Sequence, residues 1–427
     1  MKRIIILFEI AALCTLSSIS LAGPYGFDLH NVLSPKAAGM AGTTIAGEGA
    51  GPVEAIYGNP ANLKDLSGTQ FVMGATLYVP DSNAVHDGRV TGTSYDTTSN
   101  TQLYTVPQIA VTQDLSGIDI PLTIGLGMSA SSGIGVAYRD EPGTHGAGAE
   151  LIALAVNSAA AYEVSDKLDI GAALTISYST LEAGVLGSSA QTHDYGFRGT
   201  VGLDYHLTDK ADIGVYFQTK HRHRFKDMLR LGNGDQNHEG NLATNVVDID
   251  NRSLELEQPR NYAIGLSYQL NDDLRLASDF IYKEWSEADF WQKFYDNQIV
   301  FSFGAEYQHT DNLSLRLGYG WSSDPTDEID RAYDLEGFNA LCTGVGGACF
   351  NLNNPSVWNW LQAMETPVIY QHRLTSGLTY ENFLGVPFLS VDAHVGYQFK
   401  DKRHYQQSGT TMRVRSYHAG LALNWVF

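Results

Sequence analysis

The chain has 427 residues, of which only 17% are charged, and it contains 43 glycines and 23 tyrosines. Its formal net charge of −20 argues against a nucleic-acid partner, because such proteins present basic surfaces to phosphates. The length suits one large barrel, and abundant glycine and tyrosine suit closely packed strands with aromatic girdles. We expect the acidic residues to keep exposed loops solvated.

The N-terminus is typical of a secretory signal peptide. Lys2 and Arg3 precede an apolar run over 4–21, and Ser20-Leu21-Ala22 is an acceptable cleavage site. We therefore assign residues 1–22 to a signal peptide. No later run of 18 apolar residues predicts a spanning helix, so the exported chain is either soluble or a closed barrel.

Residues 23–67 show no strand-like alternation and are rich in glycine and alanine. Their apolar side chains, among them Phe27, Ile45 and Ile56, argue against a free tail. The rest of the chain is long enough for fourteen strands, and a barrel of that size is wide enough to need filling. We therefore expect this segment to form a plug, or hatch, in the lumen of a barrel formed by residues 68–427.

The remainder of the chain alternates apolar and polar residues, the period of a strand that is wet on one side only. Five stretches begin with tyrosine, pass through a polar turn and continue as an alternating strand ending in an aromatic residue: 162–178, 205–217, 268–282, 307–321 and 380–397. Aromatic residues at both strand ends suit the two interfaces of a bilayer. The expected strands are 68–79, 102–114, 121–138, 150–163, 168–181, 193–206, 211–226, 252–270, 274–285, 297–309, 313–323, 370–381, 387–399 and 411–427.

The connections between these strands alternate in length. Short turns such as 164–167 and 207–210 face the periplasm in bacterial barrels, and long loops such as 227–251 and 324–369 face outward. The last strand ends on the aromatic Phe427, which resembles the assembly signal of outer-membrane barrels. The predicted fold is an all-β, fourteen-stranded antiparallel transmembrane barrel.

The hatch segment is similar to that of the FadL family through Gly58, Asn59, Pro60 and Ala61, and the third strand also resembles this family. The resemblance implies a monomeric transporter in the outer membrane of a Gram-negative bacterium, in contact with its lipid and lipopolysaccharide. The expected function is uptake of hydrophobic small molecules, foremost long-chain fatty acids. The alternatives are an aromatic or alkane hydrocarbon importer, and a surface receptor or adhesin acting through the 324–369 loop.

Small residues in the third strand, Ser132, Gly133 and Gly135, break the alternation there, and glycine within a strand marks a bulge or bend. In the FadL family a kink at this place opens a lateral window to the membrane, so we expect a lateral gate. The alternative is a strand thinned to pack against the plug. Val136 and Ala137 stand where relatives carrying fatty acids often have an acidic residue, which leaves the cargo open.

Charged residues of both signs are predicted to face the lumen. They either form a network that holds the plug or contribute arginines that bind a substrate carboxylate, for which Arg198, Arg316 and Arg373 are candidates. In the long loop, Asn354 or Ser356 is expected to cap a short helix carrying Trp358 and Trp360. We expect these tryptophans to be exposed, either to capture a greasy ligand or to pack the loop or the membrane surface. Phe27 in the plug is a further candidate ligand contact.

Two cysteines remain after processing, Cys342 and Cys349, and an exported pair favours a disulfide over free thiols or a metal site. His221 and His223 lie among arginines and are expected near lipid phosphates or acidic loops, with a metal pair as the alternative. No catalytic motif is present in the sequence. We expect no enzymatic activity, no cofactor and no bound metal.

Overall fold

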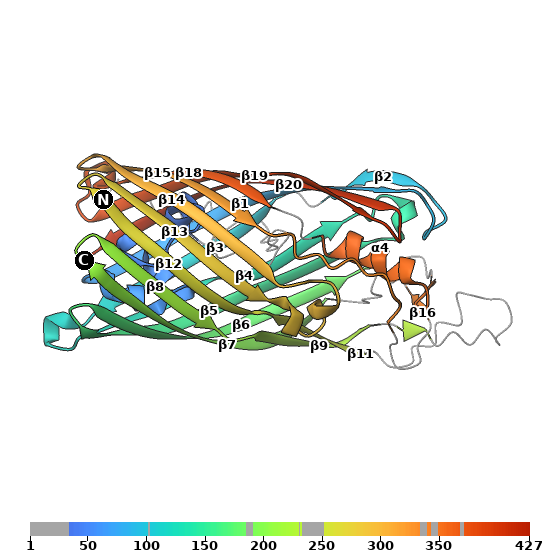
Figure 1. Ribbon diagram of the computed structural model, residues 1–427, viewed down its shortest axis with the longest axis horizontal. Helices are drawn as coiled ribbons and strands as arrows, with labels where there is room; N and C mark the ends of the chain where they lie inside the picture. Colours follow the sequence, from blue (N-terminus) through green and yellow to red (C-terminus); the bar gives the residue numbers. More distant parts are fainter. Residues whose placement is uncertain are drawn as a thin grey trace, which may run out of the picture.

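The structure, a computed structural model, describes residues 34–100, 103–184, 191–229, 231–232, 252–333, 340–342, 349–367 and 371–427. Within these ranges fourteen antiparallel strands form a closed barrel, because β1 pairs with both β20 and β3 (Figure 1). The strands are β1 (Thr69–His86), β3 (Tyr104–Asp114), β4 (Leu122–Ala137), β5 (Gly148–Ser165), β6 (Leu168–Ala183), β7 (Thr192–Thr208), β8 (Ala211–Gln218), β12 (Arg260–Asn271), β13 (Leu274–Glu284), β14 (Gln298–Thr310), β15 (Leu313–Ser322), β18 (His372–Tyr380), β19 (Leu389–Tyr405) and β20 (Thr410–Val426). The expected strand number and antiparallel arrangement are confirmed.

The alternation of the sequence becomes the two faces of the barrel wall. In β15, Leu317 and Tyr319 point outward and are exposed, whereas Ser314 and Arg316 point into the lumen and are buried. A wall that is apolar outside and polar inside is the arrangement that lipid on one side and a filled lumen on the other require. Strand pairing continues around the whole circumference and thereby satisfies backbone groups that lipid could not.

Two expected strands differ from the prediction, because each is divided. The predicted strand 211–226 is β8 followed by β9 (His221–Leu229), and 252–270 is β11 (Arg252–Gln258) followed by β12. Pro259 has no N–H to donate to a ladder, which accounts for the second break. β9 and β11 pair with each other as a separate two-stranded sheet at the long-loop end.

The described part of the plug lies inside the barrel toward its short-turn end (Figure 1). It contains α2 (Pro35–Ala38), η2 (Gly47–Gly49), α3 (Pro52–Tyr57) and η3 (Pro60–Asp65). Proline begins α2, α3 and η3, where its missing N–H would have no helical partner. Apolar residues of α3 and η3 pack against small lumenal side chains of the wall, such as Ala110, Ala155 and Ala173. Phe27 lies outside the described residues.

The opposite end carries the long connections. A helix, α4 (Pro355–Glu365), lies beside the barrel mouth (Figure 1). The other elements at this end are β2 (Tyr95–Thr98), β10 (Leu231–Gly232), β16 (Ala340–Cys342), β17 (Cys349–Asn351), η5 (Pro142–Thr144), η6 (Trp285–Glu287) and η7 (Trp291–Lys293). The turns β3–β4 and β18–β19 at the short-turn end contain η4 (Ser116–Ile118) and η8 (Phe383–Gly385). Among the described helices, none has the length and apolarity to cross a membrane.

Candidate functional site

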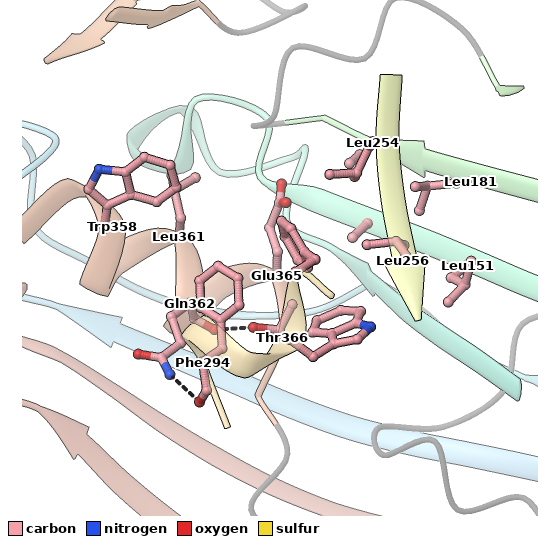
Figure 2. A pocket seen from close by; sticks show the side chains of 14 residues that line it. Leu151, Leu181, Leu254, Leu256, Phe294, Trp358, Leu361, Gln362, Glu365 and Thr366 are labelled. Carbon is pink, nitrogen blue, oxygen red and sulfur yellow. Dashed lines mark hydrogen bonds between the residues drawn. The ribbon is translucent and has the colours of Figure 1, made fainter. Parts of the chain in front are cut away.

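An apolar cavity lies at the long-loop end, between the barrel wall and the loop helices (Figure 2). Its free volume is only about 40 Å³, so the cavity is narrow. Leu151 of β5 is paired with Leu181 of β6, and Ala149 is paired with Ala183. The side chains of both pairs face the lumen and line the cavity. The other lining residues are Leu254, Leu256, Phe290, Trp291, Phe294, Trp358, Leu361, Gln362, Glu365 and Thr366.

Helix α4 supplies one wall of this cavity. Asn354 caps it by accepting a hydrogen bond of 3.0 Å from the backbone N–H of Ser356, so the predicted helix and cap are confirmed. The expected exposure of the tryptophans is wrong, since Trp358 is 6% and Trp360 is 0% exposed. Trp358 lines the cavity. Trp360 faces away from it and donates through Nε1 to the Tyr95 hydroxyl at 2.7 Å.

The polar group of Gln362 at the cavity edge is occupied by the loop backbone. Its amide nitrogen donates to the carbonyl oxygens of Phe294 at 2.9 Å and Asp327 at 2.6 Å, and its amide oxygen accepts from the Ile329 N–H. The Thr366 hydroxyl donates to the Gln362 carbonyl, as the dashed lines of Figure 2 also show. The polar atoms therefore tie α4 to neighbouring loops, and the space that remains is lined by hydrocarbon.

Below the cavity, the Gly58-Asn59-Pro60-Ala61 turn fixes the hatch to the wall. The Asn59 side chain accepts from the Ala61 N–H at 3.2 Å, and it donates to the carbonyl oxygens of Ile45 at 2.8 Å and Leu203 at 3.0 Å. It thus caps η3 and links the hatch to β7. Gly171 and Gly202 allow this approach, because a Cβ at either position would overlap the turn.

Charged groups of the lumen also hold the hatch. Asp279 accepts from the N–H groups of Thr44 at 2.8 Å and Ile45 at 3.2 Å, and Arg373 donates to the Ala41 carbonyl at 3.1 Å. These contacts agree with the expected plug-holding network.

The other two candidate arginines also contact protein groups. Arg316 bonds to Glu306 and to the Thr379 hydroxyl. Arg198 donates to the carbonyl oxygens of Thr219 at 2.9 Å and Pro259 at 2.8 Å, which flank the two strand breaks.

The expected irregularity in β4 is present, but it begins before the glycines. Pairing with β3 ends at the Gln108–Ser129 pair, whereas pairing with β5 continues to Ala137 with a register shift between Ala130 and Ser132. Ser131 is the extra residue of this bulge, and the hydroxyl of the next residue, Ser132, accepts a 2.7 Å hydrogen bond from the Gln258 side-chain amide. Gly133 and Gly135 follow within the β5 ladder, so the bulge rather than a glycine marks the break.

Two other predicted sites are also placed. Cys349 is disulfide-bonded, and the β16–β17 register sets Cys342 opposite it.

His221 and His223 are buried, and each Nε2 lies 2.7 Å from the Ser177 hydroxyl oxygen. The expectation that these histidines meet lipid phosphates is therefore wrong. The intervening Arg222 points outward and pairs with Glu255.

Most of the cavity was not anticipated from the sequence. Apolar residues at inward positions near the long-loop end, such as Leu151 and Leu181, are the signal that could have found it.

Comparison with known proteins agrees with this geometry. A family model described as "Outer membrane protein transport protein (OMPP1/FadL/TodX)" matches residues 15–348. The chain belongs to the FadL family. It is an outer-membrane β-barrel of a Gram-negative bacterium that transports hydrophobic compounds, a role of transport rather than catalysis. No curated protein sequence matches the chain.

Solved structures share the fold of this FadL-family protein. The toluene transporter TodX of Pseudomonas putida is 15% identical with a TM-score of 0.64, covering 92% of this chain and 98% of its own. The toluene transporter TbuX of Ralstonia pickettii is 17% identical with a TM-score of 0.61 and the same coverages. A Pseudomonas aeruginosa FadL homologue is 14% identical with a TM-score of 0.64, again over 92% and 98%.

Proposed function

We propose that this FadL-family protein takes up uncharged hydrophobic molecules, of the size and polarity of monoaromatic or alkane hydrocarbons. The observation that carries the proposal is the outer cavity. None of the described residues that line it is basic, and most of its wall is leucine, alanine and aromatic side chains. Burial of an apolar ligand there is favoured in proportion to the apolar area removed from water.

A fatty acid fits this wall less well, because its carboxylate needs a cation or hydrogen-bond donors when it leaves water. The acidic Glu365 lies on the wall, and the three candidate arginines are bonded to protein groups. Long-chain fatty acid uptake, the first expectation from sequence, thus remains the alternative. That two structural relatives are described as toluene transporters supports the hydrocarbon proposal as an analogy only.

The proposed route begins in the outer cavity and passes beside the hatch. Because the hatch fills the lumen at the short-turn end, its movement must accompany passage. Exit is proposed to be lateral, where β4 leaves β3 beyond Ser129. The gap in the barrel wall ends at its outer side, where the Asn100 N–H donates to the Ala137 carbonyl at 2.8 Å. We further propose that the protein acts as a monomer in contact with outer-membrane lipid.

The test exchanges one apolar wall residue for a polar one. Leu361→Asn changes the cavity wall. The control, Leu384→Asn, makes the same change at a position that is 67% exposed. Leu384 has a left-handed backbone conformation, which asparagine tolerates. Cells producing each variant at equal surface levels are given radiolabelled toluene or a labelled long-chain fatty acid. We expect Leu361→Asn to lower toluene uptake about tenfold, since about 1.4 kcal/mol of binding is lost. Leu384→Asn should match the parent.

The two cargo assignments give different results in the same assay. Toluene uptake well above that of cells without the protein, with little fatty acid uptake, supports the proposal. Efficient fatty acid uptake with background toluene uptake would overturn it. Equal toluene uptake by Leu361→Asn and the parent would remove the cavity from the route.

A further inference from the structure

A polar cluster lies at the opposite, short-turn end of the barrel, outside the proposed route. Asp204 and His206 belong to β7 and Asp212 to β8. Each offers one ligand atom, and these three atoms lie within 4.8 Å of one another. The separations from His206 Nδ1 are 2.7 Å to Asp212 Oδ1 and 3.9 Å to Asp204 Oδ2. One nitrogen and two carboxylate oxygens therefore converge on a single point.

The strand register places this cluster. Asp204 and His206 are two residues apart on one strand, so their side chains share the lumenal face. His206 stands opposite Asp212 across the β7–β8 hairpin, and Asp204 stands opposite Asp169 of β6. The ligand atoms thus come from a rigid sheet rather than from a loop, which is the support that a defined site needs.

A second carboxylate orients the imidazole. Asp169 Oδ2 lies 3.3 Å from His206 Nε2, on the far side of the ring from Asp204 and Asp212. Without an ion, Nδ1 is hydrogen-bonded to Asp212 Oδ1. When an ion displaces that proton and Nε2–H donates to Asp169, the lone pair of Nδ1 is free to bind the ion. A carboxylate that fixes the non-ligating nitrogen in this way accompanies most histidine metal ligands.

An unpartnered acceptor provides the independent sign of a ligand. The side chain of Asp204 is 1% exposed, yet its Oδ2 accepts no hydrogen bond from the residues that the structure describes. A buried carboxylate oxygen without a donor is costly, and native proteins seldom leave one. Oδ2 points toward His206, at the position where a cation would lie.

We propose that Asp204, His206 and Asp212 bind one divalent transition-metal ion of the class of Zn²⁺. Imidazole with carboxylate oxygens suits zinc and its neighbours better than Ca²⁺, which prefers six or more oxygens. Zinc bond lengths put neighbouring ligand atoms about 3.3 Å apart, so Nδ1 and the Asp212 oxygen have to separate slightly. Their side chains are 31% and 20% exposed and have room to do so.

The ion has a route in and a structural consequence. A polar pocket at the short-turn end, lined among others by His206, Asp212 and Lys210, reaches the cluster. The second oxygen of Asp204 accepts from the Gly47 N–H of the hatch at 3.3 Å, and a Cβ at Gly47 would overlap the Asp212 carboxylate. A bound ion therefore stiffens the contact between η2 and the wall, and its removal loosens the hatch.

The test uses the full-length protein in detergent, freed of any purification tag, stripped with a chelator and titrated with Zn²⁺ by calorimetry. We expect one equivalent to bind, with weaker or undetectable Ca²⁺ binding. Asp204→Asn and His206→Gln should each weaken Zn²⁺ binding at least tenfold. Asp209→Asn is the matched control, because Asp209 lines the same pocket but is not one of the three ligands. Asp212→Asn replaces Asp204→Asn should the latter fail to fold.

Hydrogen exchange of residues 44–50 is followed in parallel. Zn²⁺ should slow this exchange in the parent and in Asp209→Asn, but not in the ligand variants. Absence of stoichiometric binding, or an equal loss in Asp209→Asn, would overturn the site. Binding that leaves the exchange unchanged would overturn the link to the hatch. Neither result tests whether the outer cavity binds hydrocarbon, so the two proposals fail independently.

Discussion

The side-chain amide of Gln258 donates a 2.7 Å hydrogen bond to the hydroxyl of Ser132. The bond joins the end of β11 to the part of β4 that no longer pairs with β3, two segments that are not neighbours in the sheet. Both side chains are buried. The interrupted section of β4 is thereby held on its lumenal side, next to the proposed lateral exit.

Removing one partner of this bond should destabilise the barrel. Ser132→Ala leaves the Gln258 amide without this acceptor, and we expect a loss of about 1–3 kcal/mol in the free energy of unfolding. The double variant Ser132→Ala/Gln258→Leu should lose less stability than the sum of the losses in the two single variants, by a coupling energy of about 1 kcal/mol. Urea unfolding in lipid vesicles measures all four members of the cycle. Strict additivity would show that the bond contributes nothing.

Asn59→Ala should release the hatch from the wall. The change removes the cap of η3 and both donations, to Ile45 and Leu203, so local opening should become easier by at least about 1.4 kcal/mol. Hydrogen exchange of residues 44–62 should therefore accelerate about tenfold. Asn62→Ala is the control, since Asn62 bonds within the hatch to Thr44 and Ile45. If the two variants exchange alike, the wall contact at Leu203 has no separate role.

Gly202→Ala should displace the hatch by overlap. A Cβ at Gly202 would meet the Asn59 amide oxygen, whereas one at Gly199 on the same strand meets only the Thr219 methyl at 3.8 Å. We expect Gly202→Ala to cost about 1–3 kcal/mol and to raise ion conductance in planar bilayers. Gly199→Ala should stay within about 0.5 kcal/mol of the parent with unchanged conductance. If the Gly202→Ala protein is as stable and as closed to ions as the parent, the close contact between Gly202 and the Asn59 side chain is contradicted.

Arg198→Lys should loosen the β9–β11 sheet. The guanidinium reaches two carbonyl oxygens at once, at Thr219 and Pro259, and lysine cannot reproduce this fork. A loss of about 2 kcal/mol is expected, together with faster hydrogen exchange in β9 and β11. Arg222→Lys, in an exposed ion pair with Glu255, should change stability by less than about 0.5 kcal/mol. A substrate-binding rather than structural Arg198 would instead leave exchange unchanged.

Local patterning explains what could be anticipated. The period-two alternation along β15 or β20 fixes which side chains meet lipid, and one residue of slippage would turn them all to the lumen, so strand positions follow from the sequence. The breaks at Thr219 and Pro259 shift the buried positions by one residue, from Gln218 to His221 and from Gln258 to Asn261. They were missed because polar residues occupy both faces around each break, so the shift leaves no mark in the apolar pattern. The β4 bulge lies directly before the predicted Ser132, Gly133 and Gly135, since small residues tolerate a bend at several adjacent positions.

The sequence by itself determined the barrel, its strand number, its compartment and the presence of a hatch, because each is written in residues close together along the chain. The tertiary structure alone decided which distant side chains converge. Leu151 meets Leu256 and Leu361 around the cavity, and Asp204 meets His206, Asp212 and the hatch at Gly47. Convergence depends on strand register, loop placement and the depth of the plug. These are properties of the closed barrel as a whole, and no local pattern encodes them.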